Sequence, residues 1–124
     1  MATAIDIHGH AMPLPVLQWL EGMGLADLSS TSDGIVRIDP TVSGVGPGAP
    51  LPLAASMTDA ALRLNELDAL GLGAQAVSVP PFLMASTSTD ADLVRDVARR
   101  GNDALVDYCG ADRSRLLPLG LIPA

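Results

Sequence analysis

The chain contains two histidines, His8 and His10, which stand one residue apart in the stretch AIDIHGHAMP near its start. The alternation of apolar and polar residues predicts a strand over residues 4–9, with Ile5 and Ile7 on one face and the histidines on the other. Neutral imidazole is a common ligand of zinc and similar divalent ions. The pair therefore supplies two ligands from one strand, whereas a catalytic zinc site takes about three from the protein.

The position of the pair matters, because a bare His-x-His pattern also occurs in strands that bind nothing. The histidines stand where the first predicted strand ends, and the active sites of (β/α) barrels lie at the carboxyl ends of their strands. Gly9 between them allows another backbone or a substrate to approach closely. Asp6, on the same face, either orients a ligand from behind the histidines or is bonded to the backbone.

The composition indicates a chain with a buried α/β core. Of its 124 residues, 48% are hydrophobic and 17% are charged, which is not typical of disorder. The net charge is −7 and no arginine cluster coincides with an aromatic platform, which argues against nucleic-acid binding. The single cysteine, Cys109, is compatible with the cytoplasm. We expect no targeting segment and no membrane span, because no apolar run approaches about 20 residues.

Helices and strands alternate after the first strand. The predicted elements, in chain order, are a short helix in residues 12–24, a short exposed strand in 33–40, a loop over 42–56, a helix in 56–73, a strand in 74–82, a long helix in 88–112 and a buried strand in 115–124. Helices between nearly continuous apolar strands imply parallel crossovers, and hence a βαβαβ unit. No G-x-G-x-x-G follows the first strand, so a Rossmann fold is not indicated.

The first of the two longer helices has leucines at near-helical spacing. Leu62, Leu67 and Leu70 form its predicted buried face. We expect Ser56 or Thr58 to cap its start and a glycine to end it. These signals place the helix between two buried strands.

Three segments of the chain resemble one known family. IDIHGHAMP resembles the opening D-x-H-x-H strand of the amidohydrolase superfamily, in particular the amidohydrolase 2 branch, which includes aminocarboxymuconate-semialdehyde decarboxylase and related hydrolases. RLNELDALGLGAQAVSVPPF resembles the helix-to-strand segment of that branch, and GNDALVDYCGADRSRLLPLGLIPA resembles its next helix and strand. The resemblance covers most of the chain and is weakest around residues 22–55.

The resemblance implies the N-terminal part of a distorted (β/α)8 barrel, with an irregular insertion after the first strand. It also implies a divalent metal, commonly zinc, of which His8 and His10 match the first two ligands. Later strands of the family add another histidine and an aspartate. Such a metal activates a water molecule or polarises a carbonyl or carboxylate, so a small carboxylated substrate is either decarboxylated or hydrolysed.

Three further residues are candidates for contact with that substrate. Arg37 lies in the irregular excursion, where related decarboxylases place an arginine for a substrate carboxylate; the alternative is an exposed arginine. Phe82, just past the second long strand, would line a pocket wall, and Trp19 would line its entrance. Both also fit a packing role.

The chain departs from the family after the third barrel strand. A full barrel takes about 250 residues, whereas residues 1–124 contain no histidine after His10 and no lysine. We therefore expect a single incomplete domain with half of a metal site, inactive alone and without a catalytic residue of its own. Its open strand edges predict association with another copy or with the rest of the barrel.

Two other functions stay open. The chain is a non-catalytic α/β association module if the histidines are structural. It is a small metal-binding domain if two copies complete one site by dimerisation.

Overall fold

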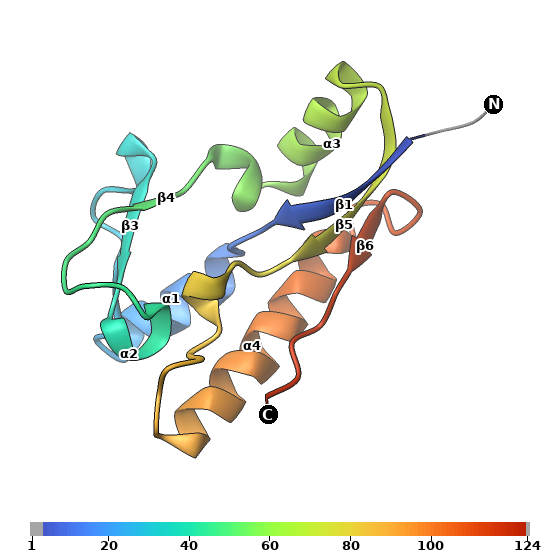
Figure 1. Ribbon diagram of the computed structural model, residues 1–124. Coiled ribbons are helices and arrows are strands. Elements are labelled where there is room, and N and C mark those ends of the chain that lie inside the picture. Colours follow the sequence, from blue (N-terminus) through green and yellow to red (C-terminus); the bar gives the residue numbers. More distant parts are fainter. Residues whose placement is uncertain (1–3, 124) are drawn as a thin grey trace.

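In the computed structural model, which describes residues 4–123, the chain forms two three-stranded sheets (Figure 1). The first sheet is parallel, in the order β1 (Ala4–His10), β5 (Leu72–Ser78), β6 (Leu116–Pro118). The second is antiparallel, in the order β2 (Ala26–Asp27), β3 (Ile35–Ile38), β4 (Leu51–Pro52). The predicted α/β class and the parallel βαβαβ order are confirmed.

Helices connect the strands of both sheets. The α-helices are α1 (Leu14–Gly22), α2 (Pro40–Ser43), α3 (Ala60–Ala69) and α4 (Ala91–Cys109). Short 3-10 turns lie between them at η1 (Thr31–Asp33), η2 (Ala55–Met57) and η3 (Pro81–Leu83). Among the described residues, none of these helices has both the length and the apolar character needed to cross a bilayer.

The excursion after β1 contains the antiparallel sheet, which the sequence patterns did not predict. Figure 1 shows this sheet beyond the carboxyl ends of β1 and β5. The strand expected to be exposed is β3, but its Val36 and Ile38 are 0% and 3% exposed. They pack in one apolar cluster with Leu17 and Leu20 of α1 and Leu83 of η3. The excursion is therefore an ordered part of the fold.

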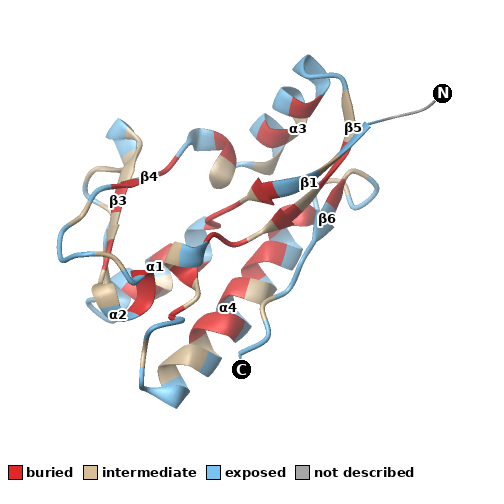
Figure 2. Ribbon diagram, in the orientation of Figure 1, coloured by how far each residue is buried: buried red, intermediate tan, exposed pale blue. Residues whose placement is uncertain are grey.

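Helices α3 and α4 cover one face of the parallel sheet. Leu67 of α3, Leu105 of α4, Val77 of β5 and Leu116 of β6 are 0–1% exposed and pack in a second cluster. Burying each such side chain contributes roughly 1.5–3 kcal/mol. In Figure 2, buried residues follow one another along α4 and along β5, next to which α4 lies. This face is therefore the buried side of the parallel sheet.

The opposite face of the parallel sheet is partly open. Leu117 follows the buried Leu116 and points the other way, since side chains alternate along a strand. Leu117 is 38% exposed and Leu119 is 52% exposed. The last predicted strand is therefore wrong in part: β6 is three residues long and only its first side chain is buried.

The buried side of α3 differs from the predicted one. Leu67 is buried, but Leu62 and Leu70 are 41% and 73% exposed, and Arg63 takes the second buried position. Residues four apart share a helix face, so Arg63 and Leu67 point together towards the sheet. The helix was predicted correctly and its orientation was not.

The caps of α3 also differ from prediction at one end. Asp59 caps the start, because its carboxylate accepts two backbone N–H groups of the first turn. The Thr58 hydroxyl instead donates to the carbonyl of Ala55, and Ser56 lies inside η2. The predicted glycine end is confirmed, since Gly71 follows the helix with φ +69°.

Candidate functional site

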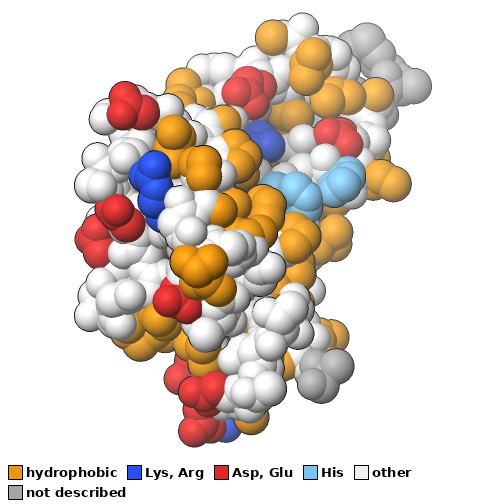
Figure 3. All heavy atoms as spheres, turned by 60° about the vertical axis from the view of Figure 1, so that its left-hand side comes forward, with side chains coloured by type: hydrophobic (Ala, Val, Ile, Leu, Met, Phe, Trp, Pro, Cys, Tyr) orange, Lys and Arg blue, Asp and Glu red, His pale blue; other side chains and the backbone are white. Residues whose placement is uncertain are grey.

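The two histidine rings meet at the carboxyl end of β1. Their Nε2 atoms are 3.0 Å apart and the ring planes make an angle of 87°. Figure 3 shows the two rings side by side on the surface. A tetrahedral zinc ion with Zn–N bonds of about 2.0–2.1 Å places two ligand nitrogens about 3.3 Å apart. The pair therefore has close to the separation that one metal ion requires.

The two Nε2 atoms are too close for both of them to carry a proton. A hydrogen bond between two ring nitrogens needs one to donate and the other to accept. Two acceptor nitrogens at this distance instead need a cation between them. The arrangement can thus either share a proton or hold a metal ion, and both uses require unprotonated imidazole nitrogen.

Ser78 of β5 fixes the second ring nitrogen of His10. Its Oγ lies 3.2 Å from His10 Nδ1, and parallel pairing of β1 with β5 places the two residues opposite each other. Metal-binding histidines usually bond their other ring nitrogen to a protein group, which fixes the tautomer. If Nδ1 donates to Ser78, Nε2 is left free to accept. Ser78 was not predicted, because only the strand register reveals it.

Asp6 bonds to the backbone of the strand that carries the histidines and not to an imidazole ring. Its Oδ1 accepts the His8 backbone N–H at 3.0 Å, and its Oδ2 accepts the side-chain amide of Gln75 at 2.8 Å. The bond from Gln75, followed by that from His8, lowers the pKa of the Asp6 carboxyl below its usual range. The carboxylate therefore stays ionised beside the histidines.

Position 9 requires glycine because the side chain of Gln75 fills the space that a Cβ atom would need. The register of β1 against β5 shifts between Asp6 and Gly9. A Cβ atom at Gly9 would lie 2.6 Å from Oε1 and 2.7 Å from Nε2 of Gln75, which is buried at 6% exposure. The space expected to admit a substrate or another backbone is thus filled by Gln75, a residue that the sequence patterns did not single out.

Arg37 lies on β3 of the antiparallel sheet. Its Nε donates to the Gly48 carbonyl at 3.3 Å, and its guanidinium also donates to Ser30 Oγ at 3.2 Å. It lines a cavity of about 290 Å³ together with Asp27 and Asp39. Two carboxylates at this cavity oppose a carboxylate ligand, and neither histidine lines it. The structure does not bring Arg37 together with the histidine pair.

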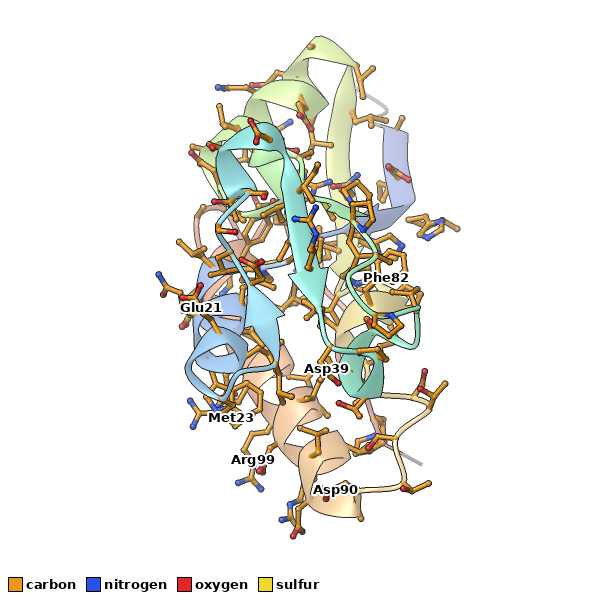
Figure 4. The ribbon with its side chains drawn as sticks, turned by 90° about the vertical axis from the view of Figure 1, so that its left-hand side faces the viewer. Glu21, Met23, Asp39, Phe82, Asp90 and Arg99 are labelled. Carbon is orange, nitrogen blue, oxygen red and sulfur yellow. The ribbon has the colours of Figure 1, made fainter. Side chains whose placement is uncertain are left out.

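The two aromatic candidates take part in packing. Phe82 is partly buried against the apolar cluster of α1 and β3, on η3, which packs against α2 (Figure 4). Trp19 of α1 is partly buried in the same cluster. The guanidinium carbon of Arg100 lies 4.9 Å from its ring centre, which is a cation–π contact between α1 and α4. Their roles in substrate binding stay predictions.

The described residues bring no complete ligand set to the histidine pair. Within residues 4–123, no group of three or more His, Cys, Asp or Glu side chains is arranged to hold a metal ion. The chain matches no model of a known protein family and no curated protein.

Proposed function

We propose that the chain is the N-terminal part of a metal-dependent amidohydrolase-type enzyme that decarboxylates or hydrolyses a small carboxylated substrate. The observation that carries this proposal is the convergence of the His8 and His10 Nε2 atoms, 3.0 Å apart. They converge at the carboxyl end of a parallel strand, and that is the end at which barrel enzymes assemble their sites. The bond from Ser78 to His10 supports the same interpretation.

The parallel sheet is, in this proposal, the first three strands of a distorted (β/α)8 barrel. In a barrel the helices lie outside and the carboxyl ends of the strands carry the site. Here α3 and α4 cover one face, the other is partly open at Leu117, and the histidine pair lies at the carboxyl end of β1. Parallel sheets are normally covered on both faces, so an incomplete barrel accounts for the open one.

The donor set fits zinc but fills only part of its coordination. Imidazole nitrogen suits zinc and related divalent ions, and a catalytic site needs about three protein ligands. When bound, such a metal would polarise a carbonyl or carboxylate oxygen of the substrate. His8 and His10 would hold it, Ser78 would fix the His10 ring, and Asp6 would hold the His8 backbone. Other strands would supply the remaining ligands, so we expect this chain alone to be inactive.

A metal-binding domain completed by dimerisation is the second candidate function. His8 is exposed, so the pair faces outwards and a second copy can bring two more imidazoles to the same ion. In either form we place the chain in the cytoplasm, with which its single buried cysteine, Cys109, is compatible.

Titration of the tag-free chain with Zn²⁺ by calorimetry tests the proposal. We expect saturable binding that weakens more than about tenfold in His8→Ala and in His10→Ala. Asp33→Ala, which removes an exposed carboxylate of η1, is the matched control and should bind as the unaltered chain does. One zinc per two chains would favour the dimer. Absence of binding, or undiminished binding by both histidine variants, would contradict the proposal.

A further inference from the structure

Arg63 is a buried cation that the proposed site does not use directly. It lies on α3 with 8% of its surface exposed, although arginine is almost never fully buried unless it is paired. The described residues contain no carboxylate in direct contact with it, since the ion pairs found involve Arg95 and Arg115. Burying a charge without hydrogen-bond partners costs folding free energy. The burial of Arg63 therefore depends on the hydrogen bonds that its guanidinium makes.

The guanidinium of Arg63 donates to three different elements. Nε donates to the Tyr108 hydroxyl of α4 at 3.0 Å, and one terminal nitrogen donates to Gln75 Oε1 of β5 at 3.3 Å. The other terminal nitrogen donates to the backbone carbonyl of His10. The Tyr108 hydroxyl in turn donates to the carbonyl of Ser56 at 2.5 Å. The planar fork of arginine suits such divergent bonding, which a lysine ammonium cannot reproduce.

Gln75 connects Arg63 to the acidic side of the histidine strand. Its amide oxygen accepts from Arg63 and its amide nitrogen donates to Asp6 Oδ2 at 2.8 Å. The same amide occupies the space in front of Gly9, where a Cβ atom would stand. Arg63 and Gln75 therefore hold β1 at both sides of His8: at Asp6 through the amide and at His10 through the carbonyl.

We infer that Arg63, acting through Gln75 and the His10 carbonyl, is a positioning residue for the histidine pair. Its hydrogen bonds go to Tyr108, to Gln75 and to the His10 carbonyl, and not to an imidazole nitrogen. It fixes the irregular end of β1, and this sets whether the two Nε2 atoms converge. The inference rests on the proposed function, in which the pair holds a metal ion, and adds a buried support that the sequence patterns did not identify.

Arg63→Lys tests the inference, with Arg115→Lys as its matched control. Arg115 also donates to strand carbonyls, those of Leu72 and Gly73, and pairs with Asp68. It acts at the amino end of β5, while His10 pairs with the carboxyl end of that strand. We expect the Zn²⁺ affinity of the folded chain to fall about tenfold to a hundredfold in Arg63→Lys and to stay within about twofold in Arg115→Lys.

Imidazole ¹⁵N–¹H NMR spectra of the metal-free chain give a second readout. The ring signals of both histidines should move in Arg63→Lys and stay in place in Arg115→Lys. If Arg63→Lys does not fold, as judged by circular dichroism, Gln75→Met breaks the link to Asp6 without removing the charge. That variant should show the same ring shifts and an affinity loss of about tenfold.

The outcomes separate this inference from the proposed function. Unchanged ring signals and unchanged affinity in a folded Arg63 or Gln75 variant would overturn it, even if the unaltered chain binds zinc. Equal losses in Arg115→Lys would also overturn it, because the effect would then be one of general stability. A chain that binds no zinc but shows the ring shifts would refute the proposed function alone.

Discussion

At the scale of single residues, His10 depends on a partner from another strand. Ser78 Oγ lies 3.2 Å from Nδ1 of His10, and this contact holds the ring with Nε2 turned towards His8. Ser78→Ala should therefore lower Zn²⁺ affinity by about tenfold, because the ring loses the bond that holds its orientation. Calorimetry measures this, with the exposed Ser86→Ala as control. Equal affinity in the two variants would contradict the role given to Ser78.

The carboxyl of Asp39 makes the stability of the fold depend on pH. Its carboxylate, at the start of α2 (Figure 4), accepts the Thr41 hydroxyl at 2.7 Å and the Thr41 N–H at 2.9 Å. These bonds hold its pKa below the ordinary value of 3.8, the hydroxyl contributing most. A carboxyl with a lowered folded pKa stabilises the fold above its unfolded pKa, and this stability is lost as pH falls through the folded pKa.

We therefore predict that the free energy of unfolding falls as pH drops below 3.8, and that Asp39→Ala makes this fall shallower. Thr41→Val, which removes only the hydroxyl, should have an intermediate effect. Urea denaturation between about pH 5 and pH 2 measures the slope. The same slope in all three proteins would show that the Asp39 bonds do not contribute.

Only part of the site was predictable at the residue scale. The strand period places His8 and His10 on one face, and the structure confirms the strand. Ser78 reaches the His10 ring and Gln75 reaches Asp6 only through strand pairing, across 68 and 69 residues, and Arg63 reaches the His10 carbonyl across 53. No local pattern encodes such distances, so these three residues were missed.

At the scale of elements, the sequence predicts that α3 is a helix but not which of its faces is buried. Leu67 is 1% exposed and packs with Val77 and Leu105, whereas Leu62 is 41% exposed. Leu67→Ala should therefore cost about 2–5 kcal/mol of unfolding free energy, since it opens a cavity. Leu62→Ala should change stability by less than about 0.5 kcal/mol. Urea denaturation compares the two, and similar costs would contradict the placement of the helix.

The small antiparallel sheet shows why elements can escape prediction. β2 and β4 are two residues long, so they contain no full period of alternation. Their place is set by the apolar cluster that they share with α1 and with η3, and η3 is distant from both strands in the chain. By contrast, β1, β5 and α4 are seven residues or longer, and their periodicity was sufficient to predict them.

At the scale of the whole molecule, apolar side chains remain exposed at both edges of the parallel sheet. Ile7 on β1 is 80% exposed, and Leu119 and Ile122 after β6 are 52% and 88% exposed. Open edges and exposed apolar surface favour association. The incomplete barrel that we propose requires such surfaces to be covered.

We predict that the chain associates with itself in solution. The double variant Ile7→Ser with Leu119→Ser should shift it towards monomer, because these side chains lie on the two edges. Leu70→Ser, at the end of α3 and 73% exposed, is the control and should not. Sedimentation velocity over a range of concentrations measures the shift. A well-folded monomer at high concentration would contradict the prediction.

Zinc X-ray absorption of the tag-free, zinc-loaded chain tests the central claim most directly, since it counts imidazole nitrogens around the metal. We predict two imidazole nitrogens per zinc at about 2.0–2.1 Å, with one lost in His10→Ala. Four per zinc would instead indicate the dimeric site. A spectrum without imidazole scattering, or one that is the same in His10→Ala, would contradict the claim that His8 and His10 form half of a metal site.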